Sequence, residues 1–345
     1  MRVERKTITE FIIGEQRKMP GASGGFTALL NDIRLACKRI AYMVGKGALA
    51  DVPPDELRAV ANETFVRTNE WGGHLAAMAS EAECGLRQIP DAYPRGRYLL
   101  AFDPLCGGQS LAVNAVAGSL FSVLRAPGGE AEPNETDFLQ PGRAQLCAGY
   151  AIYGPTTMLV LALESGVNGF TLDREIGEFM LTHPAIRIPE HTSEFAVDTS
   201  NARHWRPAVK RYVDECLAGR AGPRGRDFHM RWAASLVGDT HRILMQGGVF
   251  LHPCDERQHD GSGHRLLFEA NPVGYLIERA GGRASVGAAP LLEVLPATLD
   301  QRTSLIFGSP REVERLEQYH RDHNERDFDA PLFGTRGLFR ASAEL

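Results

Sequence analysis

The apolar residues of this chain follow two different periods, and each period predicts one kind of element. Between Phe26 and Lys46 the apolar positions recur every three to four residues, which is the period of an amphipathic α-helix. We expect further helices at 7–19, 55–71, 205–218, 236–245, 273–280 and 310–319. Short apolar runs that lack this period predict buried strands. These strands are expected at 74–80, 98–103, 158–163, 169–172, 248–251, 266–269, 294–298 and 304–307.

The order of these elements predicts the fold class. Helices and strands alternate along the chain, which favours an α/β protein built from layers of sheet and helix. Segment 111–124 should pair with the strand at 98–103, and segment 144–154 fits either a helix or a strand.

A chain of 345 residues is long enough for two domains or for one large layered unit. The composition changes near residue 190, through Ile188-Pro-Glu-His-Thr192. We therefore expect a domain boundary there, with one domain at 1–190 and a second at 191–345.

The stretch from Tyr98 to Ser110 combines a buried strand with a sharp turn. A mostly apolar run leads into Asp103, which is followed by Pro104 and by glycines at 107 and 108. Proline fixes its own φ and glycine permits a tight reversal, so the Asp103 carboxylate should be held at the carboxyl end of the strand. Such a carboxylate suits Mg²⁺, which takes oxygen ligands and leaves room for a substrate phosphate. An aspartate-capped turn explains the same residues, and this stretch alone leaves both interpretations open.

Composition and charge narrow the class of protein. Apolar residues make up 43% and charged residues 23%, as in ordinary globular proteins, and the net charge of −5 argues against a general nucleic-acid surface. The N-terminus lacks the apolar core of a signal peptide, and no window approaches ~18 uninterrupted apolar residues, so no membrane span is expected. The six cysteines form no Cys-x-x-Cys pair, which indicates reduced thiols in a cytoplasmic protein. Only Cys106 stands where chemistry is expected.

Several short motifs occur in an order and spacing that point to one family. They include Phe102-Asp-Pro-Leu105, Gln140-Pro-Gly-Arg143, Ala148-Gly-Tyr-Ala-Ile-Tyr-Gly154, Gly247-Gly-Val-Phe250 and Arg265-Leu-Leu-Phe-Glu-Ala-Asn-Pro272. Together they resemble class I fructose-1,6-bisphosphatase, a Mg²⁺-dependent sugar phosphatase. The resemblance implies a layered sugar-phosphatase fold with a metal-binding N-terminal domain and a substrate-binding C-terminal domain. It also implies a homotetramer that hydrolyses fructose 1,6-bisphosphate to fructose 6-phosphate and phosphate, as part of carbohydrate metabolism.

The family's metal site carries over at some positions and not at others. The positions that match metal ligands of the family are Glu81, Asp103, the carbonyl of Leu105 and Glu269. Ala82 replaces the second glutamate of a paired-glutamate motif, and Cys106 replaces a metal-binding aspartate. Arg58 stands in place of an aspartate on the loop that closes over the site in the family.

The substrate-binding positions of the family are also only partly retained in this sequence. The positions that match substrate-binding residues are Gly107, Asp198, Arg231 and Ser235. Asp198 replaces an asparagine, and its charge would repel phosphate. Arg231 matches an arginine that the family contributes to the sugar-phosphate pocket of a neighbouring subunit. Parts of the family's AMP-inhibition site are resembled by Gly24, Thr27, Arg97 and Tyr98, which makes AMP a candidate ligand.

Two functions remain open at this point. The first is the fructose-1,6-bisphosphatase reaction with a sugar bisphosphate and Mg²⁺, which the matching ligand positions favour. The second is a catalytically degenerate relative that binds a sugar phosphate or regulates an active paralogue, which the replacements at 58, 82, 106 and 198 favour. No residue is assigned a catalytic role.

Overall fold

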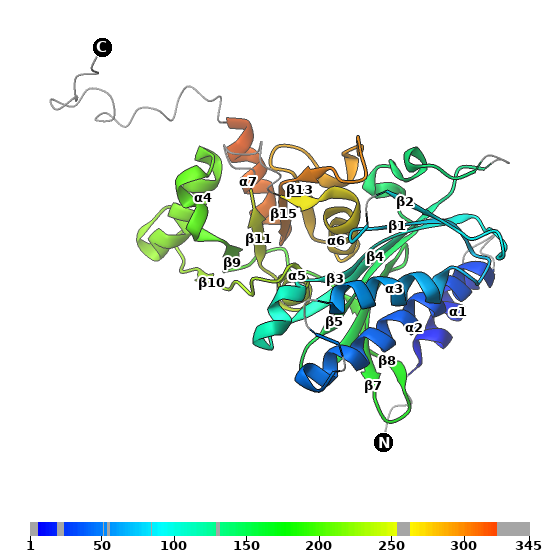
Figure 1. Ribbon diagram of the computed structural model, residues 1–345. Helices are drawn as coiled ribbons and strands as arrows, with labels where there is room; N and C mark the ends of the chain where they lie inside the picture. The colour runs from blue at the N-terminus through cyan, green and yellow to red at the C-terminus, as the bar shows by residue number, and fades with distance from the viewer. Residues whose placement is uncertain are drawn as a thin grey trace, which may run out of the picture.

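The largest sheet has eight strands, in the order β2-β1-β3-β4-β5-β6-β7-β8 (Figure 1). The computed structural model describes residues 6–18, 24–50, 52–53, 56–83, 85–128, 132–253 and 263–322. The strands of this sheet are β1 (Leu75–Ser80), β2 (Leu86–Gln88), β3 (Tyr98–Cys106), β4 (Ala117–Arg125), β5 (Cys147–Tyr153), β6 (Thr157–Leu163), β7 (Gly166–Asp173) and β8 (Glu178–Ile186). β1 and β3 run parallel, and the other neighbouring strands are antiparallel.

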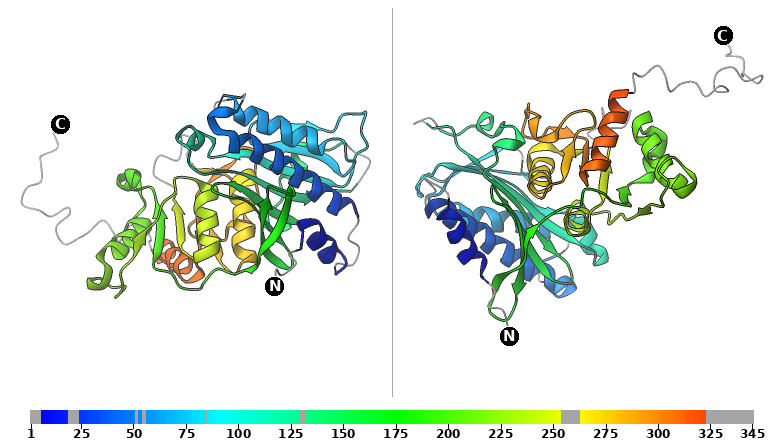
Figure 2. Two further views of the ribbon diagram at one scale, coloured as in Figure 1. Left: turned by 90° about the horizontal axis from the view of Figure 1, so that it is seen from below. Right: turned by 180° about the vertical axis from the view of Figure 1, so that it is seen from behind.

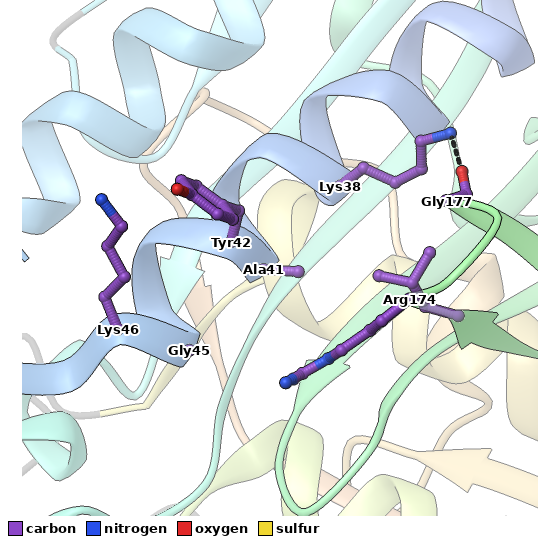
Figure 3. Close-up of a pocket in the computed structure, with 8 residues that line it drawn as sticks. Lys38, Ala41, Tyr42, Gly45, Lys46, Arg174 and Gly177 are labelled. Carbon is purple, nitrogen blue, oxygen red and sulfur yellow. Dashed lines mark hydrogen bonds between the residues drawn. The ribbon is translucent and has the colours of Figure 1, made fainter.

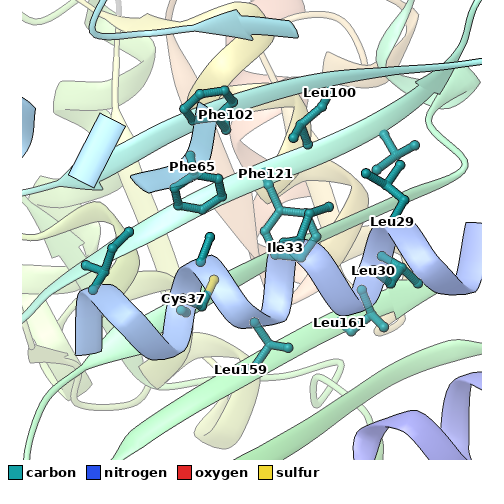
Figure 4. Close-up of a cluster of buried hydrophobic side chains, with 14 of the residues drawn as sticks. Leu29, Leu30, Ile33, Cys37, Phe65, Leu100, Phe102, Phe121, Leu159 and Leu161 are labelled. Carbon is teal, nitrogen blue, oxygen red and sulfur yellow. The ribbon is translucent and has the colours of Figure 1, made fainter. Parts of the chain in front are cut away.

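Three helices cover one face of this sheet: α1 (Ile8–Gln16), α2 (Gly24–Lys46) and α3 (Leu57–Asn69) (Figures 1 and 2). α1 begins at a capping box, in which the Thr7 side chain accepts a hydrogen bond from the Glu10 amide and the Glu10 side chain accepts one from the Thr7 amide. The buried face of α2 points Ile33 and Cys37 toward the strands (Figure 4). Phe65 of α3 stacks on Phe102 of β3, with ring centroids 4.8 Å apart. This packing holds the residue before Asp103 rigidly.

The opposite face of the sheet packs against α5 (Leu236–Gln246) and α6 (Asn271–Arg279), which separate it from a second sheet (Figure 2). Ser235 caps the N-terminus of α5, since its hydroxyl oxygen accepts a hydrogen bond from the Gly238 amide. A single buried cluster joins Tyr150 of the first sheet, Val237 and Leu276 of the helices, and Phe250 of the second sheet. The two sheets therefore share one hydrophobic core.

The second sheet has the strand order β10-β9-β11-β15-β13. Its strands are β9 (Glu194–Val197), β10 (His229–Met230), β11 (Val249–His252), β13 (Arg283–Ser285) and β15 (Leu305–Gly308). A short pair, β12 (His264–Arg265) with β14 (Arg302–Thr303), lies apart from it. The outer face is covered by α4 (Pro207–Ala218) and α7 (Pro310–Asp322). The alternation of helix and sheet layers confirms the α/β, layered fold class expected from the sequence.

Segment 111–124 pairs with β3 only through β4, from Ala117 onward, because Gly108–Val113 is a 3₁₀-helix, and two of the expected strands do not form. Residues Leu266–Ala270 form a π-helical turn that leads into α6, so the strand expected at 266–269 is wrong. The strand expected at 294–298 is also wrong, because a short 3₁₀-helix at Leu291–Glu293 comes just before it and residues 294–298 contain no strand. Periodicity cannot separate a short buried helical run from a buried strand, which explains the error at 266–269.

Three further expectations are resolved or lie outside the described part. The ambiguous segment 144–154 is a strand, β5. Asp55, expected at the start of α3, lies outside the described residues, as do two of the six cysteines, at 84 and 254. In the portion of the chain that the structure describes, none of the helices combines the length and apolarity needed to span a bilayer. The division into domains at residue 190 stays a prediction.

Candidate functional site

Asp103 lies where β3 leaves its regular pairing with β4. Asp103 pairs with Leu120 and Cys106 with Gly118, so β3 carries one extra residue over this interval. This β-bulge re-aims the backbone around Pro104. The Pro104 carbonyl accepts a hydrogen bond of 2.6 Å from the Ser119 hydroxyl. The Leu105 amide donates one of 3.1 Å to Asp103 Oδ1, so the carboxylate is held in place by its own turn.

Glu269 is presented by the π-helical turn at Leu266–Ala270. π-Helical turns are rare and occur often at functional sites. The Arg265 amide donates a hydrogen bond of 2.7 Å to Glu269 Oε2, and His264 Nδ1 lies 3.5 Å from the same oxygen. β3 and this turn are in contact, which brings Glu269 next to the bulge.

The two carboxylates meet at a three-residue cluster that includes Cys106. One ligand atom from each of Asp103, Cys106 and Glu269 lies within 4.8 Å of the others. Cys106 Sγ is 4.0 Å from Glu269 Oε1 and donates a weak hydrogen bond to it. Asp103 is 3% exposed, so the cluster is almost closed to bulk water.

Burial sets the charges in this cluster. Burial and the nearby Glu269 charge raise the pKa of Asp103 to about 7, against a smaller opposing effect of Arg58. Burial opposes ionisation of Glu269 too, but the hydrogen bond and charge of His264 and the Arg265 amide lower its pKa overall. Burial and the two carboxylates raise the pKa of the Cys106 thiol well above its ordinary value. The free cluster therefore holds one firmly ionised carboxylate, one that titrates near neutral pH, and a thiol.

A hard divalent cation fits two of these three groups. In a buried space the charge of one carboxylate makes ionisation of the other more costly, and a cation between them would relieve that repulsion. Mg²⁺ is often held by one or two carboxylates and keeps other positions for water and phosphate. A protonated thiol is a poor ligand for Mg²⁺, which prefers oxygen. Asp103 and Glu269 therefore suit the metal, and Cys106 does not.

Glu81 lies at the end of β1 but is not part of this three-residue cluster. Its amide donates a hydrogen bond of 2.9 Å to the Phe102 carbonyl, which places it beside β3. Its carboxylate forms ion pairs with Arg58 of α3 and with Arg265, whose Nε is 2.9 Å from Glu81 Oε1. Arg265 also pairs with Asp300. Sequence reasoning did not anticipate these arginine contacts, because they depend on how α3 and the β12–β14 pair approach β1.

The expected substrate residues fall into two groups. Gly107 has a left-handed backbone, with φ of 71°, and a side chain there would come within 3.4 Å of Ser235 Oγ. Gly107 and Ser235 are therefore neighbours beside the cluster. Asp198 follows β9 and lies close enough to His252, at the end of the adjacent β11, for its charge to act on that imidazole.

Arg231 lies further out, directly after β10. Its amide donates a hydrogen bond of 2.8 Å to the Phe195 carbonyl, and its guanidinium is 3.8 Å from Glu194. The side chain is 58% exposed. Two large side chains on either side of it, Met230 and Trp232, are 47% and 46% exposed. This segment is therefore an exposed apolar surface with an arginine at its centre.

Two surface pockets lie on other elements. One of about 440 Å³ lies between α2 and the turn that joins β7 to β8 (Figure 3). It is lined by the cationic side chains of Lys38, Lys46 and Arg174, and the Lys46 ammonium is 4.8 Å from the centre of the Tyr42 ring. Another, of about 500 Å³, includes Arg97 and Tyr98 of the candidate AMP site. The expectation of AMP binding stays a prediction.

Comparison with known proteins assigns the chain to a family. A model of the fructose-1,6-bisphosphatase N-terminal domain matches residues 6–184, and a model of the C-terminal domain matches residues 188–321. The chain belongs to the fructose-1,6-bisphosphatase family. The resemblance inferred from the sequence motifs is therefore confirmed, and this is a family of phosphatases, which are hydrolases of carbohydrate metabolism.

Similar proteins and structures agree with the family assignment. The class 1 fructose-1,6-bisphosphatase of Hydrogenophilus thermoluteolus is 58% identical over 97% of both chains. That of Methylibium petroleiphilum is 52% identical over 97% of this chain and 98% of its own. The holo crystal structure of Leishmania major fructose-1,6-bisphosphatase superposes with a TM-score of 0.83 at 34% identity, over 93% of this chain and 100% of that one. Both sequence relatives are named as enzymes, so they lend no support to the non-catalytic alternative.

The raised pKa of Asp103 predicts how stability changes with pH in the metal-free protein. The ordinary pKa of this carboxyl is 3.8, and the folded chain raises it to about 7. The folded state thus binds a proton that the unfolded state releases in this window, and that stabilisation is lost as the pH rises from about 4 to about 7. Relative to an Asp103→Asn variant, we expect the free energy of unfolding to fall by up to about 4 kcal/mol across the window.

Urea denaturation in the presence of a chelator, at pH 4.5 and pH 7.5, measures this difference. Asp214→Asn is the control, because Asp214 is exposed on α4. If wild type and Asp103→Asn show the same dependence on pH, the Asp103 carboxyl does not carry the raised pKa.

Proposed function

We propose that this chain hydrolyses fructose 1,6-bisphosphate to fructose 6-phosphate and phosphate, with Mg²⁺ as the cofactor. The observation that carries the proposal is the convergence of Asp103 and Glu269 in one buried cluster, in a chain that belongs to this family. Removal of phosphate from a sugar needs positive charge around the phosphoryl oxygens and exact positioning of water more than it needs covalent chemistry by side chains. Oxygen ligands for a divalent cation are the first requirement.

In this proposal Asp103, Glu269 and the Leu105 carbonyl hold the cation. When bound, it neutralises charge on the phosphoryl group and on the leaving oxygen. The chain itself supplies the rest. The β-bulge and the hydrogen bond from the Leu105 amide keep Asp103 in one rotamer, and the Arg265 amide does the same for Glu269. Little motion is then needed to form the cation site, which is what preorganisation requires.

The phosphate side of the pocket follows from Gly107 and Ser235. The left-handed turn at Gly107 exposes backbone with no Cβ to block an approaching phosphate. Ser235 begins α5, an eleven-residue helix whose N-terminal end carries partial positive charge. We infer that the 1-phosphate binds between this turn and the cation, with Asp198 and its neighbour His252 toward the sugar.

The first test is phosphate release from fructose 1,6-bisphosphate over a series of Mg²⁺ concentrations. Asp103→Ala should lower turnover at least about 100-fold, because loss of one preorganised group that stabilises transition-state charge commonly costs that much. Asp214→Ala, on the exposed face of α4, should leave turnover unchanged. Wild-type turnover no higher than that of Asp103→Ala would overturn the proposed function.

The second test concerns Cys106. A carboxylate at this position would add a hard ligand to Asp103 and Glu269, so Cys106→Asp should raise the affinity for Mg²⁺ about tenfold and increase turnover at low Mg²⁺. Cys106→Ser is the control for size and polarity without charge. Magnesium titrations followed by the thermal unfolding midpoint give the affinity. A weaker affinity in Cys106→Asp than in Cys106→Ser would show that Cys106 does not face the cation.

The third test concerns assembly. We propose a homotetramer in which Arg231 reaches the pocket of a neighbouring subunit, as its exposure and the flanking Met230 and Trp232 favour. Arg231→Ala should raise KM about tenfold, since a guanidinium–phosphate contact is lost. Mixed oligomers of Arg231→Ala and Asp103→Ala subunits should recover activity, because each subunit supplies what the other lacks.

Light scattering checks the oligomeric state, and dissociation and reassociation of the two variants form the mixture. Arg311→Ala is the control, because Arg311 is equally exposed on α7. If the mixture is no more active than the sum of its parts, Arg231 acts within its own subunit or not at all.

A further inference from the structure

Glu81 is enclosed by two guanidinium groups that come from different elements. Arg58, in the first turn of α3, pairs with Glu81 Oε2, and Arg265, just before the π-helical turn, pairs with Glu81 Oε1 at 2.9 Å. Each carboxylate oxygen thus lies next to one guanidinium, although neither Glu81 Oε2 nor Arg265 Nε forms a hydrogen bond. The Glu81 side chain is only 14% exposed and Arg265 is 20% exposed, so the contact between them is largely shielded from water, whereas the Arg58 side chain is 43% exposed. Ion pairs of this kind are screened much less than surface pairs.

The positive charges of Arg58 and Arg265 and the negative charges of Glu81 and Asp300 cancel one another. Arg265 is shared between Glu81 and Asp300, and Arg58 supplies the second positive charge. Two guanidinium groups and two carboxylates sum to zero, so Glu81 retains no charge that a metal ion is needed to balance. Arginine stays protonated in any protein environment and presents several donors in a rigid plane, which makes this neutralisation permanent.

Arg58 also lies close enough to the three-residue cluster of Asp103, Cys106 and Glu269 for its charge to act on it. Its charge opposes the rise in the pKa of Asp103, so the guanidinium lies within electrostatic range of that carboxylate. Arg58 is 43% exposed, and Glu81 is 14% exposed. A second cation beside Glu81 would have to displace this guanidinium and would be repelled by it until it moved.

We propose that Arg58 and Arg265 take the place of a divalent cation beside Glu81, so that the chain binds a single divalent ion, at Asp103 and Glu269. The inference rests on the proposed cation site of the preceding subsection. Part of the positive charge of the pocket is thus carried by arginine side chains and does not depend on metal concentration. Arg58 is in this view a positioning residue that holds Glu81 away from metal binding.

The experiment measures the number of divalent ions bound per subunit and does not depend on the turnover rate. Mn²⁺ replaces Mg²⁺ as a spectroscopic probe, and electron paramagnetic resonance gives the free ion while calorimetry gives the number of sites. The full-length wild-type chain should bind one Mn²⁺ per subunit. Arg58→Gln should free one oxygen of Glu81 and create a second site, or tighten binding about tenfold through removal of the repulsion.

Arg67→Gln is the matched control. It removes the same charge from the same helix, but Arg67 is 72% exposed and pairs with Glu63 one turn away. It should bind one Mn²⁺ with wild-type affinity. Circular dichroism verifies that both variants keep their helices. A double variant, Arg58→Gln with Glu81→Gln, should return to one site, which tests that Glu81 supplies the new ligand.

The outcomes separate this inference from the proposed function. Two or more wild-type sites of similar affinity, or an unchanged count and affinity in Arg58→Gln, would overturn the role of the arginines even if phosphate release is normal. No Mn²⁺ binding by the wild type would overturn the cation site itself. Binding of one ion together with absent turnover would leave the arginine inference standing and would count against the phosphatase reaction.

Discussion

Two carboxylates that share one buried space repel each other, and the folded chain forces Asp103 and Glu269 into that position. The loss of hydration and the repulsion together raise the pKa of Asp103 to about 7. A structure tolerates such a conflict only where neighbouring elements over-determine it. The β-bulge of β3 and the π-helical turn before α6 are the two irregularities that create the conflict, and both depart from regular structure at the residue that carries the carboxylate.

The packing around these irregularities explains why they persist. The Ser119 hydroxyl contacts both the Pro104 carbonyl, at 2.6 Å, and the Tyr153 hydroxyl, at 2.7 Å, so the bulge is fastened to β4 and β5. On the other face Phe65 stacks on Phe102 and fixes the last regular residues of β3. The π-helical turn is held by its continuity with α6, which is buried between the sheets. Burial of apolar surface on both sides thereby stabilises the two irregular segments.

The layered architecture and the strand that carries Asp103 could be predicted from the sequence, because period and turn residues are local signals. Glu269 was matched from its motif even though its segment was assigned to a strand, since a motif reports the residue and not the backbone around it. The pairing of Glu81 with Arg58 and Arg265 could not be predicted. It depends on the approach of α3 and of the β12–β14 pair to β1, and no spacing along the chain encodes that distance. The same limit applies to the proximity of Gly107 and Ser235.

The shared core between the two sheets has a consequence for how the molecule can come apart. Tyr150, Val237, Leu276 and Phe250 belong to one cluster, in which α5 and α6 bury their apolar faces between the two sheets. Separation of the first sheet from the second would expose the apolar inner faces of both to water. The free energy lost with that burial would not be compensated by contacts within either part. The change of sheet near residue 190 therefore does not interrupt the hydrophobic core, which continues from the first sheet to the second.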